Sequence, residues 1–256
     1  MSQNSPEYWE RRLKDRGTLV TASLNYMLDR VQQLMNMNNG LSEEEAWGVI
    51  EQEVLEQEKR LQEKIIHIIG NILAAGEGRS QGRRVVEVAV GPGHLTASLV
   101  PYALNQGYIY SGLDFSAQML ASTRDRLLKL GIPAEAIDLR QASATNLPFG
   151  ELSAWLVTWG RLGLHLVEEA IWQSGLDEVK RILEPGAYFL LYEAMIEGNL
   201  HHRNCPRKEK TPTYIRERAA YEKQLYPMRL LESIFWPFCN EVYTIAVFQN
   251  DQKESL

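Results

Sequence analysis

The sequence predicts an α/β fold in which a doubly wound, mostly parallel sheet carries helices on both faces, with a helical extension at the N-terminus. Three observations predict it. Runs rich in β-branched residues alternate with amphipathic stretches from residue 85 onward, the first run ends in a Gly-Pro-Gly turn at 91–93, and residues 1–80 show helical periodicity alone. Strands that alternate with helices form βαβ units, which build parallel sheets. We therefore expect a helical region at 1–80 and a sheet domain at 81–256.

Composition narrows the class of protein. The 256 residues are 45% hydrophobic and 23% charged with a formal net charge of −6, which excludes disordered and collagen-like classes. No apolar run approaches the roughly 18 residues of a membrane span, and the charged first thirty residues lack a signal-peptide core. The acidic balance argues against nucleic-acid binding. We therefore expect a cytoplasmic protein without membrane or nucleic-acid partners.

The N-terminal region is predicted to form helices at 6–16, 18–36 and 42–75. Ser42 with Glu45 three residues later is a capping box, and Gly76 supplies a stop signal. The third helix would span about 50 Å, which is long for one domain, so a break along it is an open alternative. We expect this extension either to cap a binding pocket or to pair two copies into a homodimer.

The sheet domain is predicted from its hydrophobic runs and the polar turns between them. We expect strands at 85–90, 108–114, 136–142, 154–160, 187–196 and 241–249, and helices at 94–107, 116–131 and 168–183. The last strand is predicted to be antiparallel and to lie at or near an edge of the sheet.

The Gly-Pro-Gly turn predicts a nucleotide-binding site. Ligands of open parallel sheets bind at the carboxyl ends of the strands, and glycine lets a ligand approach the backbone closely. NAD(P) and S-adenosylmethionine both use such turns. Glu87 interrupts the apolar strand, and Thr96 stands where a dinucleotide-binding motif has its third glycine. The pattern favours S-adenosylmethionine, which has no pyrophosphate for the full glycine set to hold.

Four segments resemble, in order, the motifs of the class I S-adenosylmethionine-dependent methyltransferases, which have a Rossmann-like fold. VVEVAVGPGHLT resembles their acid-x-G-x-G-x-G motif, and YSGLDFSAQML resembles their second-strand motif. RQASATNLPF resembles the segment ending in Leu-Pro-Phe, and DEVKRILEPGAYFLLYE resembles the helix, turn and fifth strand. The resemblance covers about 83–196 and is nearest to members that modify small molecules. It implies S-adenosylmethionine as cofactor and a small-molecule acceptor.

The resemblance places the methionine and ribose of the cofactor at the first two strands. Glu87 matches the family acid that orders the glycine loop and meets the methionine ammonium, often through water. Gly91 and Gly93 would lie beneath the methionine and ribose, with Ala89 at the first glycine of the motif. Asp114 would accept the two ribose hydroxyls.

The resemblance also implies an adenine end of the site. Phe115 would flank the adenine, and a core position is the alternative for this side chain. Ser143 and Ala144 fall where the family has Asp-Ala beside the adenine amino group. Thr158, on the strand expected at 154–160, completes the predicted cofactor set.

Three departures from the family pattern leave alternatives open. Ala89 replaces a glycine, Ser143 replaces an aspartate, and Ala154-Trp155 replace the Phe-Asp pair that usually opens the fourth strand. One alternative is a partner or scaffold protein that binds the cofactor without transferring methyl groups. Another is an enzyme that uses the cofactor for different chemistry.

The acceptor end is predicted near the ends of the fourth and fifth strands. Methyl transfer from a sulfonium mainly requires positioning of donor and acceptor, and a base is needed only if the acceptor loses a proton. His165 and Glu193 are the candidate catalytic bases, with a structural role as the alternative for each. Trp159 and Arg161 are candidate acceptor-pocket residues, which core packing and a surface charge explain equally well.

A basic insertion at about 197–229 follows the fifth strand. Because this segment borders the acceptor pocket in the family, we expect Arg203, Arg207 and Lys208 to steer an anionic acceptor or an acidic peptide. The His-His-x-x-Cys run at 201–205 has no second cluster to complete a metal site, so no metal is predicted.

Overall fold

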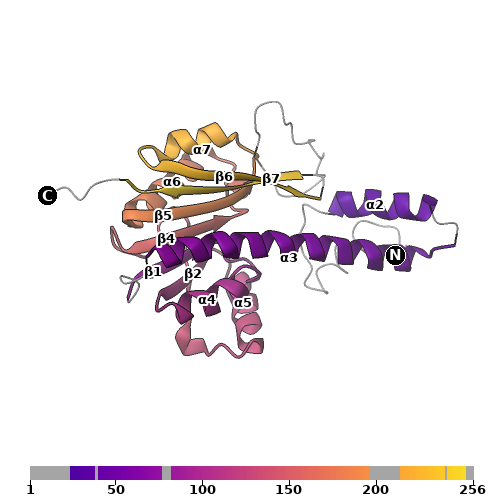
Figure 1. Ribbon diagram of the computed structural model, residues 1–256, viewed down its shortest axis with the longest axis horizontal. Helices are drawn as coiled ribbons and strands as arrows, with labels where there is room; N and C mark the ends of the chain where they lie inside the picture. The colour runs from indigo at the N-terminus through magenta and orange to yellow at the C-terminus, as the bar shows by residue number, and fades with distance from the viewer. Residues whose placement is uncertain (1–23, 38–39, 77–81, 196–213, 240, 252–256) are drawn as a thin grey trace. The chain divides into compact units, whose positions relative to one another are not determined.

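A computed structural model describes residues 24–37, 40–76, 82–195, 214–239 and 241–251 (Figure 1). The chain divides into two compact units. The first comprises Met1–Leu61 with Pro237–Glu241, and the second comprises Gln62–Trp236 with Val242–Leu256. The units therefore divide between residues 61 and 62, whereas the sequence predicted a boundary near residue 80.

The first unit is built on α2 (Leu24–Met37) and the N-terminal half of α3 (Glu43–Ala75). The predicted capping box begins α3: the Ser42 amide donates to Glu45 at 2.9 Å, and the Glu45 amide donates to the Ser42 hydroxyl at 3.3 Å. α3 runs without a break over 33 residues, so the alternative of an interrupted helix is wrong. Apolar side chains from both helices form the core of this unit: Tyr26, Met27, Val31, Ala46, Trp47, Ile50 and Val54.

The second unit contains a seven-stranded sheet of order β3-β2-β1-β4-β5-β7-β6. Strands β1 to β5 pair in parallel, and β7 runs antiparallel to β5. The strands are β1 (Arg84–Val88), β2 (Ile109–Asp114), β3 (Asp138–Gln141), β4 (Ala154–Gly160), β5 (Leu183–Ala194), β6 (Arg229–Phe238) and β7 (Glu241–Gln249). The expected fold class and the antiparallel last strand near an edge are confirmed.

The remaining helices flank the sheet and connect its strands. They are α4 (Thr96–Asn105), α5 (Ala117–Lys129), α6 (Glu169–Ile182) and α7 (Arg218–Leu225), with short 3-10 helices η2 (Ala134–Ala136) and η3 (Gly163–His165). Within the described part of the chain, none of the helices is long and apolar enough to cross a membrane.

Helices cover both faces of the sheet, as expected. Trp159 of β4 packs against α6, where a Cβ added at Gly175 would lie 2.9 Å from the indole. Thr158, the preceding residue, points to the other face and is aligned through β5 with Val247. Val247 and Ile72 of α3 line one cavity, so the C-terminal part of α3 covers the face opposite α6.

The sheet domain follows the predicted order of elements closely. The strands expected at 154–160 and 241–249 have the predicted bounds, while β5 begins four residues earlier than expected. Two elements were not predicted, namely α7 and the edge strand β6. The helix expected at 6–16 and the start of that expected at 18–36 lie outside the described residues.

Candidate functional site

The glycine loop leaves β1 in a left-handed conformation. Gly91 and Gly93 have φ angles of 54° and 79°, values that favour glycine. A Cβ added at Gly93 would lie 2.9 Å from the Thr123 side chain of α5, so α5 requires glycine there. At Gly91 a Cβ would meet no atom within 4 Å. The loop is therefore packed at Gly93 and open to a ligand at Gly91.

Ala89 keeps the backbone of the motif glycine that it replaces. Its φ is 61°, in the left-handed region that costs an L-residue with a Cβ about 1–2 kcal/mol. This is the region of φ that the motif glycine at this position would adopt freely. This departure is therefore expected to cost stability at the loop.

Asp114 joins the loop to the end of β2. Its Oδ2 accepts the Gly91 amide at 2.9 Å, and its Oδ1 accepts the Ser116 amide at 2.8 Å. Each carboxylate oxygen retains a further lone pair, so Asp114 can still accept hydroxyl hydrogens. Phe115 beside it is 78% exposed, which excludes the core alternative and leaves its ring available to a ligand.

Glu87 lies inside the protein rather than at the surface of the loop. It is 4% exposed, and its Oε2 accepts the Tyr110 hydroxyl at 2.7 Å. Burial raises the pKa of Glu87 to about 7, against the opposing hydrogen bond from Tyr110. The predicted contact with the methionine ammonium stays a prediction. Thr158 is aligned with Glu87 across β1 and β4 and is fully buried.

A tight turn follows β3 and lies next to Asp114. The Ala142 amide donates to the Asp114 carbonyl at 3.0 Å, and the Asn146 amide donates to the Ser143 carbonyl at 3.1 Å. The Ser143 hydroxyl accepts the Thr145 amide at 3.2 Å. The structure thus brings Ser143 and Ala144 to the site with Asp114, and the Ser143 hydroxyl holds the turn itself.

The Leu-Pro-Phe segment is fixed from α6. Arg181 donates to the carbonyls of Leu147 and Phe149 at 3.1 and 2.9 Å. Glu178 accepts the Leu147 amide at 2.7 Å and pairs with Arg181. The hydrogen bond from Arg181 lowers the pKa of Glu178 below its usual value. The turn at 143–146 is therefore held at both ends.

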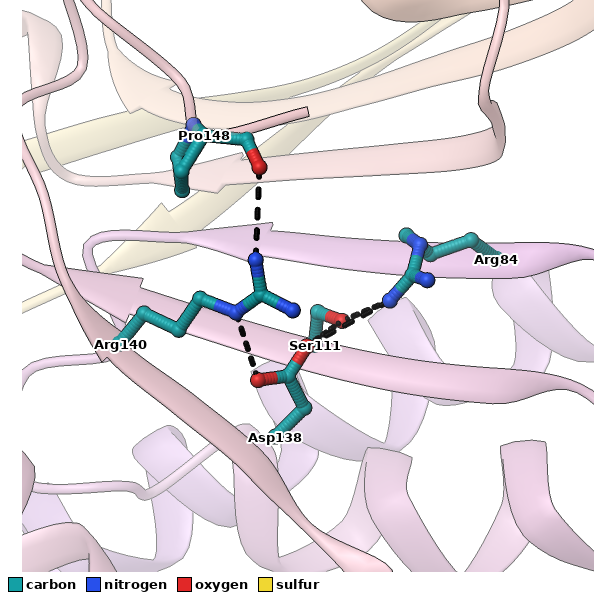
Figure 2. A network of polar contacts seen from close by, with 5 residues as sticks. All are labelled: Arg84, Ser111, Asp138, Arg140 and Pro148. Atoms are coloured by element: carbon teal, nitrogen blue, oxygen red, sulfur yellow. Dashed lines mark hydrogen bonds and ion pairs between the residues drawn. The ribbon is translucent and has the colours of Figure 1, made fainter. Parts of the chain in front are cut away.

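A second cluster holds the same segment from the sheet. Figure 2 shows Asp138 between two arginines: Arg140 donates to it at 2.7 Å, and Arg84 lies at 3.4 Å. Both guanidinium groups lie over the Phe149 ring, at 5.2 Å for Arg84 and 5.4 Å for Arg140. Burial alone would raise the pKa of Asp138, but hydrogen bonds from Arg140 and Ser111 lower it.

The acceptor end is the loop that follows β4. Glu193 is fully buried, and its Oε1 accepts the Trp159 indole N–H at 3.0 Å and the Gly163 amide at 2.7 Å. Burial raises the pKa of Glu193 to about 7, against these hydrogen bonds. His165 ends η3 and is exposed. The two predicted bases therefore differ in access, and only His165 is open to a substrate.

Arg161 stands where β4 meets this loop. Its φ is 54°, and its guanidinium lies over the Tyr243 ring at 5.1 Å and the Tyr192 ring at 6.0 Å. Tyr192 lies across Gly160, where a Cβ would come within 1.9 Å of the ring. Arg161 thus belongs to an aromatic cluster at the strand ends. Trp159 is fully buried, so it packs in the core and does not line an open pocket in this structure.

Two arginines of the basic insertion, which the sequence predicted to border an anionic acceptor, pair with carboxylates of the protein. Arg216 is 4% exposed and pairs with Glu169 at 3.1 Å, and Arg218 pairs with Glu222. Sequence reasoning missed the structural role of Arg216, because a buried arginine and a surface arginine look alike in a basic run. Arg203, Arg207, Lys208 and the run at 201–205 lie outside the described residues. Among the described residues, no cluster of His, Cys, Asp or Glu could hold a metal ion.

Comparison with known proteins identifies the sheet domain. Residues 85–186 match the model of a methyltransferase domain. A demethylmenaquinone methyltransferase of Desulfitobacterium hafniense (strain Y51) is 35% identical over 108 residues, covering 41% of this chain and 40% of that protein. Another, from Chlorobaculum parvum, is 31% identical over 133 residues, half of each protein. The matches thus span about half or less of these curated relatives.

Solved structures share the fold at low sequence identity. The N-methyltransferase NodS of Bradyrhizobium japonicum, solved with S-adenosyl-L-homocysteine, has a TM-score of 0.55 at 15% identity, covering 75% of this chain and 88% of that one. The [4+2]-cyclase SpnF has a TM-score of 0.56 at 13% identity over 72% and 81%. The open face at Gly91, the lone pairs of Asp114 and the exposed Phe115 fit the cofactor of this family. The match of residues 85–186 to a methyltransferase domain thus confirms the resemblance to the class I S-adenosylmethionine-dependent methyltransferases.

Proposed function

We propose that this protein transfers a methyl group from S-adenosylmethionine to a small aromatic acceptor. The observation that carries the proposal is the left-handed loop at 89–93, which Asp114 joins to β2 within a methyltransferase domain. This arrangement has an open backbone at Gly91 and carboxylate lone pairs beside it. Those are the features that a ribose with two free hydroxyls needs.

In this proposal, different residues bind different parts of the cofactor. Asp114 accepts the ribose hydroxyls, Gly91 admits the close approach of the ligand, and Phe115 stacks on the adenine. The turn at Ser143 and Ala144 borders the adenine edge. When bound, S-adenosylmethionine supplies the methyl group as an already activated sulfonium. The protein's main task is then to align the acceptor with that methyl group.

The acceptor is proposed to be a quinol-like ring. Support comes from the relatives, which are named as demethylmenaquinone methyltransferases, and from Arg161 with Tyr192 and Tyr243 at the strand ends. A guanidinium beside aromatic rings suits a flat ring that carries negative charge on oxygen. In this proposal, the anionic character that the sequence predicted lies on a phenolate-type oxygen.

The transfer is an in-line displacement at the methyl carbon. Loss of the hydroxyl proton makes the neighbouring ring carbon nucleophilic, and His165 is the accessible base for that proton. The ring carbon forms a bond to the methyl group as the bond to sulfur breaks, and the electron pair of that bond stays on sulfur. The proton on the substituted carbon then passes to water, which restores the aromatic ring.

The experiment is a release assay for S-adenosylhomocysteine with reduced naphthoquinols that lack the ring methyl group. We expect turnover that requires the reduced form, because the oxidised quinone has no hydroxyl to deprotonate. Transfer to aliphatic carboxylates or amines instead of quinols would contradict the proposed acceptor.

A second candidate function is binding of the cofactor without transfer, by a partner or scaffold protein. The observation that favours it is Ser143, whose hydroxyl is used inside its own turn and brings no charge to the adenine. Cofactor binding without turnover across quinol, phenol, amine and carboxylate acceptors would support this function over the first.

A further inference from the structure

The loop between β4 and α6 is held at one residue, Gly163, by two buried side chains. Glu193 of β5 accepts the Gly163 amide at 2.7 Å. Arg216 donates to the Gly163 carbonyl at 3.0 Å. Both polar groups of one residue are thus bound by side chains from elements distant in sequence. The loop that carries Arg161 and His165 has its position set at Gly163.

Glu193 lies in the protein interior, against the backbone of this loop. The carboxylate is fully buried, and its Oε1 also accepts the Trp159 indole N–H at 3.0 Å. On the same side, a Cβ added at Gly163 would come within 2.2 Å of the Tyr221 hydroxyl. The loop backbone therefore packs closely against the groups that hold it. Glu193 is therefore enclosed by the protein and has no surface open to a substrate in this structure.

Arg216 also supports the loop. It is 4% exposed, donates to the Leu166 carbonyl at 2.8 Å and stacks over Trp172 at 4.5 Å. The Tyr214 amide donates to the Leu164 carbonyl at 2.8 Å. The main chain of the loop is thus bound by groups outside it at residues 163, 164 and 166, and the Arg161 amide donates to the Tyr192 carbonyl at 3.0 Å.

We propose that Glu193 is a positioning residue that fixes the loop at 161–167 for methyl transfer and does not itself take a proton from the acceptor. This inference rests on the proposed function for the meaning of the loop. A positioning role needs only an oxygen that accepts two N–H groups, whereas a base needs an ionisable carboxylate. Glutamine supplies the first and lacks the second.

The experiment compares Glu193→Gln with Glu193→Met, two side chains of similar length and volume that differ in the accepting oxygen. We expect Gln to keep the hydrogen-exchange protection of the amides at 161–167 and at least a third of kcat. We expect Met to speed exchange of the Gly163 amide at least tenfold and to lower kcat at least tenfold. The acceptor KM and the cofactor Kd should change less than threefold in both. Thr244→Val, opposite Glu193 on β7, is the matched core control and should change none of these quantities.

Two results would overturn the inference. One is a Gln variant whose kcat falls as far as that of the Met variant while its loop stays protected, since that marks a base. The other is a Met variant with unchanged exchange at 161–167. Exchange and cofactor affinity are measured without an acceptor, so they decide the positioning role even if no acceptor is methylated, a result that would count only against the proposed function.

Discussion

Replacing Ala89 by glycine tests how much the left-handed backbone at this position costs the protein in stability. The residue has a φ of 61°, which costs about 1–2 kcal/mol for a residue with a Cβ. Glycine would remove this cost, but it would also increase the conformational entropy of the unfolded chain, which offsets part of the gain in stability. We predict that Ala89→Gly raises the free energy of unfolding by about 0.5–1 kcal/mol, measured by urea denaturation. Ala121→Gly, on the exposed face of α5, is the control and should lower it by about 1 kcal/mol. A loss of stability in both variants would show that Ala89 is not strained.

The raised pKa of Glu87 predicts that the stability of the protein depends on pH. Its pKa is about 7 in the folded protein, above the value of roughly 4.3 expected for an unfolded chain. Between these values the folded state binds more protons than the unfolded state, so this group makes the free energy of unfolding fall as pH rises from about 4 through 7. We predict that Glu87→Gln flattens this fall, and that its stability relative to wild type grows from pH 5 to pH 8. Parallel stability curves for the two proteins would contradict the assignment.

Among the elements, the Leu-Pro-Phe segment links the helix α6 to the cofactor end of the site. Arg181 donates to two carbonyls of the segment through one planar group, which lysine cannot reproduce. We predict that Arg181→Lys raises the Kd for S-adenosylmethionine about fivefold, corresponding to the roughly 1 kcal/mol of a lost hydrogen bond, as measured by calorimetry. Arg124→Lys, on the exposed side of α5, should leave Kd unchanged. Equal affinities in both variants would mean that the segment does not position the turn at 143–146.

The elements that the sequence predicted are those with a strong apolar signal. β4 has buried residues at almost every position, and its bounds were predicted to the residue. β6 was missed because its mostly exposed and intermediate positions give neither an alternating nor a continuous apolar pattern. Asp114 was predicted because YSGLDFSAQML resembles the second-strand motif of the methyltransferase family. The burial of Glu193 and Arg216 depends on contacts between strands and loops far apart in sequence, which no local pattern contains.

At the scale of the whole molecule, the N-terminal unit keeps two predicted roles, a cap over the acceptor pocket or a pairing element between two copies. Light scattering of the full chain distinguishes them. A dimer would have twice the chain mass of 29.3 kDa. A mass of 29.3 kDa at micromolar concentration would contradict the pairing role and favour the cap.

We propose that the methyltransferase domain binds S-adenosylmethionine through the loop at 89–93 and Asp114. Titration calorimetry of the full chain with S-adenosylmethionine tests it most directly, comparing wild type with Asp114→Asn and with the exposed α5 control Asp125→Asn. We predict one cofactor per chain, a Kd raised at least tenfold in Asp114→Asn, or about 1.4 kcal/mol of binding free energy, and no change in Asp125→Asn. No binding by wild type, or equal affinity in the two variants, would contradict the account.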